Sequence, residues 1–171
     1  MKAQNNSGRL DPLNDPIQFG AHVGAKIPRL ILINPGWYFW SIENGTLVKS
    51  FDKELLQQLF RKTTQINIPS ASGKVIVADY FNIHGNGLTD VKLRPASDSG
   101  TILTSGEVVT KCVLDLSHAY YCASDSTKPN YAPVQNHVID LYFGGSKANV
   151  TEDAAIRFFS NPANFANSEQ S

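Results

Sequence analysis

The chain has 171 residues, 42% of them hydrophobic and 10% aromatic, which is enough apolar material to bury the core of one domain. Fifteen Lys and Arg balance fifteen Asp and Glu, which excludes a molecule-wide basic field that would draw nucleic acid or anionic lipid. The polar amino terminus and the lack of a run of roughly 18 apolar residues predict neither a signal peptide nor a membrane anchor. We therefore expect a cytoplasmic protein without a membrane partner.

The first part of the chain changes from polar to apolar near residue 17. Residues 1–16 have no hydrophobic periodicity and predict a flexible arm. Residues 26–33 form an apolar run that predicts a short helix, with Pro28 tolerated in its first turn. We expect residues 17–62 to be the helical part of the fold.

Two further helices are expected before the first strand. Asn34 precedes a proline and is the expected cap of a helix over residues 35–44, which Gly45 ends. Ser50 is the expected cap of a helix over residues 51–62, with acidic residues in its first turn and basic residues in its last.

The hydrophobic period then changes from that of a helix to that of a strand. Residues 74–83, 88–96 and 106–116 alternate in polarity and are separated by glycine-containing turns, which is typical of an antiparallel meander. Residues 136–145 predict a further strand. The segment between these strands, residues 117–133, predicts a loop.

One helix is expected to close the fold. Thr151 is the expected cap of a helix over residues 152–160, and residues 166–171 are a short tail. Helices before a mostly antiparallel sheet, with one helix after it, indicate an α+β fold. We expect one domain over residues 17–165, with its sheet in residues 74–145.

The segment from residue 17 to residue 45 is rich in both aromatic and chain-breaking residues. We expect Gly20 and Gly24 to bend the chain into a tight turn, and the helix behind it to cover this turn. Trp37 and Trp40 are then mostly core residues. The alternatives are a platform on which a nucleic-acid base stacks and an apolar groove for a peptide.

The same segment carries two short motifs with a fixed order: Phe19-Gly20-x-His22-x-Gly24 and then Pro35-x-Trp37-Tyr38-x-Trp40. This pattern resembles the small domain at the carboxy end of exodeoxyribonuclease X and of related bacterial and phage proteins. The resemblance covers residues 17–60 only. It implies a small accessory protein that acts in a nucleic-acid context.

The chain departs from that family at two positions. The family has lysines that are natural phosphate contacts where this chain has Ala21 and Val23. Lys26 and Arg29 are the only nearby cations in the sequence. The resemblance therefore implies the fold more strongly than the activity.

One constellation of residues points to a reaction. Asp79 in one expected strand and Asp90-x-Lys92 in the next have the spacing of nucleases that hold Mg²⁺ between two carboxylates. Lys92 would orient or activate the attacking water, and Glu43 or Glu54 would complete the site. The competing interpretation is that Asp79 lies on an apolar face and that Asp90, Lys92 and Arg94 lie on a solvated one.

The cysteines and histidines give weaker signals. Cys112 and Cys122 are expected to be ordinary thiols, although Cys122 would pair with His118 in a helical segment, with Asp115 as its orienting group. No metal is expected from the histidines, because none of them forms a pair at metal-ligand spacing: His22, His84, His118 and His137.

A glycine-rich stretch before the last helix contains Gly144, Gly145 and Lys147. Such a stretch can cradle phosphate at the start of a helix, but it lacks the full P-loop pattern. We interpret it as a turn between a strand and a helix.

The sequence favours a binding protein without a catalytic function or a cofactor. Its partner is nucleic acid or another protein, and homo-oligomerisation is left open. The alternatives are a Mg²⁺-dependent nuclease and a structural or oligomeric protein without a small-molecule site. The residues expected to contact a partner are Lys26, Arg29, Trp37, Trp40, Arg61, Lys62 and Arg94.

Overall fold

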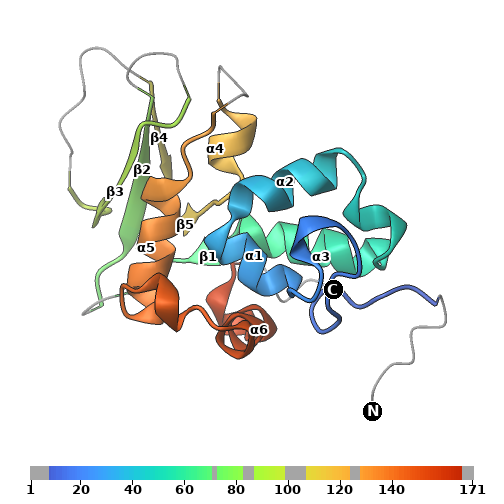
Figure 1. Cartoon of the computed structure of the whole chain (residues 1–171). Helices are drawn as coiled ribbons and strands as arrows, with labels where there is room; N and C mark the ends of the chain where they lie inside the picture. Colours follow the sequence, from blue (N-terminus) through green and yellow to red (C-terminus); the bar gives the residue numbers. More distant parts are fainter. Residues whose placement is uncertain (1–7, 71–72, 83–86, 99–106, 124–127, 167–171) are drawn as a thin grey trace.

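The computed structural model describes residues 8–70, 73–82, 87–98, 107–123 and 128–166. Helices and antiparallel strands share the chain, so the fold is α+β, as the sequence predicted. Figure 1 shows the arrangement: a three-stranded sheet stands at one side of the molecule, and the helical body lies beside it. None of the helices in these ranges is long and apolar enough to cross a membrane.

The predicted entry turn is confirmed. Gly20 and Gly24 both have positive φ, at 68° and 86°, which residues with a Cβ rarely adopt. The turn is closed by backbone hydrogen bonds, among them Ile17 N–H to Ala25 O at 2.9 Å. Residues 8–16 are not a loose arm: Leu10 N–H bonds to Ser50 O at 3.0 Å. The rest of the predicted arm, residues 1–7, lies outside the described residues.

Two short helices follow this turn. Helix α1 (Ile27–Ile33) accommodates Pro28 in its first turn, where a helix needs no N–H donor. Asn34 ends α1 and caps α2 (Pro35–Glu43), as predicted, because its side chain accepts the Trp37 N–H at 3.3 Å.

Helix α3 (Lys53–Thr63) begins two residues later than predicted. Its cap is Asp52, whose Oδ1 accepts the N–H groups of Glu54 and Leu55, both at 3.0 Å. Ser50 was the wrong choice, because it ends the short 3₁₀ helix η2 (Leu47–Lys49) that precedes α3. A carboxylate at this position also interacts favourably with the helix dipole.

The sheet is antiparallel, but it is not a meander. Its strands are β2 (Ile76–Asn82), β3 (Asp90–Pro95) and β4 (Glu107–Lys111), in the order β3-β2-β4. Strand β4 pairs with the side of β2 that β3 leaves free, so β2 is the central strand. A second sheet of two short strands pairs β1 (Ile66–Asn67) with β5 (Val113–Leu114). The predicted strand over residues 106–116 is therefore split at Cys112.

The predicted strand over residues 136–145 is wrong, because this segment belongs to helix α5 (Ala132–Phe143). Its buried residues include Val134, Val138, Ile139 and Phe143, which form one helical stripe. A window that starts at residue 136 leaves out the first turn, and the apolar run then imitates a strand. The predicted loop before it also contains a short helix, α4 (His118–Tyr121).

The closing helix is confirmed at its predicted bounds. Helix α6 (Glu152–Ser160) begins at Thr151, whose Oγ1 accepts the Ala154 N–H at 3.1 Å. The short 3₁₀ helices η3 (Lys147–Asn149) and η4 (Pro162–Asn164) flank it.

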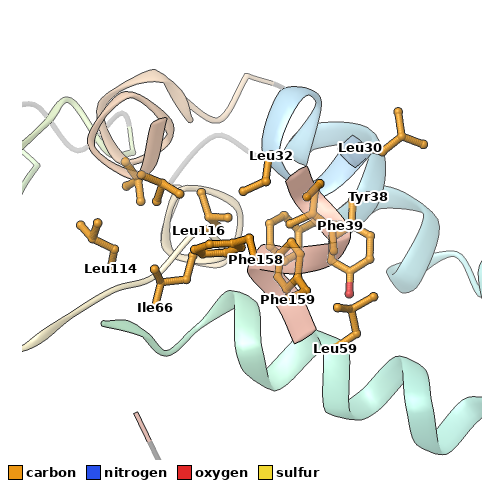
Figure 2. Packing of buried hydrophobic residues seen from close by; sticks show 14 of the residues in the cluster. Leu30, Leu32, Tyr38, Phe39, Leu59, Ile66, Leu114, Leu116, Phe158 and Phe159 are labelled. Carbon is orange, nitrogen blue, oxygen red and sulfur yellow. The ribbon is translucent and has the colours of Figure 1, made fainter. Parts of the chain in front are cut away.

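One buried cluster joins these parts of the chain. Phe158 and Phe159 of α6 lie among Tyr38 and Phe39 of α2 and Leu59 of α3 (Figure 2). The same cluster includes residues of the β1–β5 pair and of the inner face of the three-stranded sheet: Ile66, Leu114, Ala78, Tyr80 and Val91. The core therefore lies between the helices and one face of the sheet.

Candidate functional site

A groove lies between the helices of the structure. It has a volume of about 500 Å³ and is open to solvent. Helix α3 supplies five of its eight lining residues, and the end of α2, η2 and α4 supply one each. We call it the α3 groove, and its lining residues are Ile42, Val48, Lys53, Leu56, Gln57, Phe60, Arg61 and Tyr121.

The repeat of the α-helix explains why one helix supplies most of this lining. Residues four apart lie on the same face, one turn above the other. Leu56 and Phe60 form an apolar row, and Lys53, Gln57 and Arg61 form a polar row beside it. The two cations stand about 12 Å apart along the axis, at 1.5 Å per residue.

An aromatic cluster holds the far wall of the α3 groove in place. The Phe39 ring lies 6.0 Å from the Phe60 ring and 6.3 Å from the Tyr121 ring. Phe60 and Tyr121 are themselves 6.3 Å apart at an edge-to-face angle of 69°. Phe39 is fully buried behind these two rings, while Tyr121 is 52% exposed.

The charge around the α3 groove is uneven. Its lining contains Lys53 and Arg61 but no acidic residue. Glu43 accepts a hydrogen bond from the Tyr120 hydroxyl. It therefore does not take the place in a metal site that the sequence suggested for it. Burial, and then the charge of Glu43, raises the pKa of Tyr121, which keeps this phenol neutral.

The two tryptophans do not line this groove. Trp40 is 49% exposed, so its expected place in the core is wrong. Trp37 is half-buried, and its ring contacts the His22 ring edge-on at 4.6 Å. The sequence predicted that helix α2 covers the glycine turn. Of the two tryptophans, Trp37 makes this contact through His22, and Trp40 does not. Of α2, only Ile42 reaches the α3 groove.

Most of the predicted partner-binding cations are engaged within the molecule. Arg29 Nε donates to Val150 O at 2.9 Å, and Lys62 Nζ donates to Phe159 O at 2.8 Å. Burial lowers the pKa of Lys62. Lys26 is half-buried as the cap of α1. Of these five predicted cations, Arg61 alone lines the groove.

Asp79 lies on the outer face of the sheet, opposite Lys92 and beside Arg94. The residue is 6% exposed, and its carboxylate accepts hydrogen bonds from Arg94 and, at 2.5 Å, from Thr110 Oγ1. Burial raises the pKa of Asp79, but the hydrogen bonds from Arg94 and Thr110 outweigh it and lower the pKa below its ordinary value. Asp79 thus serves as the centre of a cross-strand network.

The other members of the predicted nuclease motif lie nearby but are not assembled with Asp79. Lys92 Nζ is 4.0 Å from Asp90 Oδ2, and both side chains are exposed. Asp90 Oδ1 accepts the Val91 N–H at 2.8 Å. Within the ranges that the structure describes, no group of three or more His, Cys, Asp or Glu is placed to hold a metal ion.

The Cys122 and His118 pair is present, because α4 makes this segment helical. Cys122 Sγ lies 3.4 Å from His118 Nδ1. Asp115 does not orient the imidazole: its carboxylate accepts bonds from Lys111 and Ser117 instead. Burial raises the pKa of the Cys122 thiol, so the environment does not favour the reactive thiolate.

The glycine-rich stretch is a turn, but it joins two helices. Gly144 ends α5 with φ at 66°, and its Schellman-like bond runs from Gly145 N–H to Ile139 O at 3.1 Å. Lys147 lies in η3. Of the remaining histidines, His137 Nε2 lies 2.7 Å from Val91 O, and His84 lies outside the described residues.

The α3 groove was not predicted as a site. The row of Leu56 and Phe60 is visible in the sequence as part of the apolar face of a helix, which does not by itself indicate a groove. Tyr121 was assigned to a loop, so nothing in the sequence placed it against α3. Comparison with protein-family models, curated proteins and solved structures found no match. The resemblance to the exodeoxyribonuclease X tail domain stays a prediction.

Proposed function

We propose that the protein is a non-catalytic binding module, and that its α3 groove takes an amphipathic helix of a protein partner that carries acidic residues. The observation that carries this proposal is the lining of the groove: an apolar row, Leu56 and Phe60, runs beside Lys53 and Arg61. Its volume of about 500 Å³ is within the usual range of ligand sites.

The conformation of the partner follows from its backbone. Among the lining side chains, the Gln57 amide and the Tyr121 hydroxyl alone could accept a main-chain N–H of a bound peptide. An extended segment would therefore leave most of its N–H groups without an acceptor on the groove. A helix satisfies these groups internally and presents one apolar face, which is the established mode of helix-in-groove recognition.

The charge of the partner follows from the polar row. Lys53 and Arg61 are about 12 Å apart, which is eight residues of a helix that lies along α3. Carboxylates about two turns apart on the partner therefore face both cations. Such rim charges contribute chiefly to the association rate and to selectivity, and they are weakened by salt.

The positions of the cations favour a protein partner over nucleic acid. Arg29, Lys62 and Arg94 are held by internal hydrogen bonds, and Trp40 stands away from the groove. A nucleic-acid site needs several cations that neutralise phosphates together.

A defined peptide tests the proposal. The probe is a helix-forming peptide with a leucine stripe and two glutamates two turns apart, titrated by fluorescence anisotropy. We expect saturable binding that Tyr121→Ala and Arg61→Glu each weaken about tenfold, equivalent to ~1.4 kcal/mol. Lys147→Glu makes the same charge change in η3, which does not line the groove, and should leave the affinity unchanged.

Two results would contradict the proposal. The first is equal affinity for a peptide in which both glutamates are replaced by lysine. The second is binding that survives Tyr121→Ala and Arg61→Glu. Tight binding of a single-stranded oligonucleotide, with a steep loss on added salt, would instead support the nucleic-acid alternative.

A further inference from the structure

The three-stranded sheet has two edge strands, and they differ in how their outer backbone groups are used. The order β3-β2-β4 leaves β3 and β4 each with one neighbour among the described strands. An edge strand presents a row of N–H and C=O groups that can pair with another chain. Such a group is free to pair only where no hydrogen bond within the chain already occupies it.

The direction of each backbone group follows from the alternation of an antiparallel ladder. Val75 O accepts from Ala96 N–H and Phe81 O accepts from Thr89 N–H, both at 2.9 Å, so the odd-numbered residues of β2 direct their backbone toward β3. The even-numbered residues of β2 direct theirs toward β4. Tyr80 is opposite Val109, so Val109 faces β2, and Val108 and Thr110 face away.

The edge of β3 is partly closed, and α5 packs against it. By the same alternation its outward-facing residues are Val91, Leu93 and Pro95, and of these Leu93 has no backbone hydrogen bond on this side within the described ranges. Pro95 has no N–H to donate. The Val91 N–H is taken by the Asp90 side chain at 2.8 Å, and the Val91 carbonyl lies 2.7 Å from His137 Nε2 of α5. Proline, side-chain bonds and a covering helix are the means by which proteins protect an edge.

The edge of β4 is open. Within the described ranges, neither the N–H nor the C=O of Val108 or Thr110 has a hydrogen-bond partner in the chain. Val108 is 38% exposed, and Thr110 and Glu107 are exposed as well. The N–H and C=O groups of Val108 and Thr110 can therefore pair with a further strand along this edge.

The sequence of β4 is complementary to itself. Reversed about Val109, the strand Glu107-Val-Val-Thr-Lys111 places each glutamate opposite a lysine. It also places Val108 opposite Thr110, and Val109 opposite its own copy. A two-fold axis through Val109 therefore places each Glu107 opposite a Lys111 of the other copy. It also pairs the N–H and C=O groups of Val108 and Thr110 with those of the other copy.

We infer that β4 is a self-association edge, at which two copies of this chain pair antiparallel about Val109 to make one continuous six-stranded sheet. Val108 and Thr110 of the two copies exchange their N–H and C=O groups. Glu107 of each copy lies opposite Lys111 of the other in a non-hydrogen-bonded pair, where side chains approach most closely. The α3 groove lies elsewhere, so this pairing is independent of the proposed function.

The first test is the mass of the full chain by sedimentation equilibrium over a range of concentrations. We expect a reversible monomer–dimer equilibrium that weakens with added salt, because Glu107 is exposed and Lys111, which also bonds to Asp115 at 2.6 Å, is partly exposed. A mass that stays monomeric up to about 1 mM would overturn the inference.

Val108→Pro tests the edge itself. The Val108 N–H faces away from β2, so proline at this position removes a donor from the edge and none from the internal ladder. We expect a folded monomer with an unchanged circular dichroism spectrum. A folded Val108→Pro variant that dimerises like the wild type would overturn the inference.

A mixing experiment tests the register. Glu107→Lys opposes lysine with lysine in the homodimer, and Lys111→Glu opposes glutamate with glutamate, so each variant alone should be mostly monomeric. An equimolar mixture restores both opposite-charge pairs and should dimerise. A mixture no more dimeric than its components would overturn the two-fold axis at Val109. If Lys111→Glu fails to fold, the Val108→Pro result decides.

Discussion

At the scale of single residues, two buried tyrosines show how a hydroxyl group contributes to stability. Tyr38 is fully buried, and its hydroxyl has no hydrogen-bond partner in the described part of the chain. The Tyr80 hydroxyl accepts the Asp115 N–H at 2.7 Å and donates to Val113 O at 3.4 Å. Burial raises the pKa of both phenols far above the ordinary value, so both remain neutral.

We expect opposite effects from removing these two hydroxyl groups. Tyr38→Phe should raise the free energy of unfolding by about 1 kcal/mol, because an unpaired buried hydroxyl is destabilising. Tyr80→Phe should lower it by about 1–2 kcal/mol, because the buried Asp115 N–H loses its partner. Urea denaturation of both variants measures the difference. A loss of stability in Tyr38→Phe would show that its hydroxyl is bonded.

His118 gives the fold a dependence on pH. Burial, and then the positive charge of Lys111, lowers the pKa of His118 below its ordinary value of 6.5. The unfolded chain therefore binds a proton at a higher pH than the folded chain does. The contribution of neutral His118 to the free energy of unfolding is fully present above pH 6.5. It is lost as the pH falls from 6.5 toward the lowered pKa of the folded state.

Replacing His118 should remove this dependence. We expect His118→Gln to flatten the loss of stability below pH 6.5, measured by urea denaturation at several pH values. An NMR titration of the wild-type imidazole should have its midpoint below 6.5. A midpoint above 6.5 would mean that Asp115 and Glu107, which both favour the protonated form, outweigh burial and Lys111.

At the scale of elements, caps and apolar stripes decided which sequence predictions were right. Helix α6 was predicted at its full length, because Thr151 and the buried Phe159 are both visible in the sequence. Helix α5 was missed, because its stripe begins at Val134, before the apolar run that imitates a strand. The pairing of β4 with β2 depends on long-range closure of the sheet, which local sequence does not encode.

The cap of α3 gives a test at this scale. Asp52→Ala should lower the free energy of unfolding by about 1 kcal/mol, because two N–H groups lose their acceptor. Ser50→Ala is the matched control, since the sequence favoured Ser50 as the cap, and it should change stability little. Thermal denaturation of both variants compares them. Equal effects would contradict the assignment of Asp52.

At the scale of the whole molecule, the fold separates two surfaces with different chemistry. The helical side carries the α3 groove with its apolar row and two cations, and the sheet side carries the partly closed edge of β3 and the open edge of β4. Sequence patterns placed Asp79 on an apolar face and Lys92 and Arg94 on a solvated one, but the strand register puts all three on the outer face of the sheet. Nothing in the sequence indicated that Arg94 and Thr110 bond to Asp79. The groove was equally hidden, because it forms only where α4 approaches α3.

The most direct test of the central claim is an NMR titration of the isotopically labelled full chain with the acidic amphipathic peptide. We expect the largest shift changes at the amides of Lys53, Gln57 and Arg61 and around Tyr121, with those of the three-stranded sheet unchanged. Changes confined to the sheet, or no changes at peptide concentrations up to about 1 mM, would contradict the assignment of the α3 groove as the binding site.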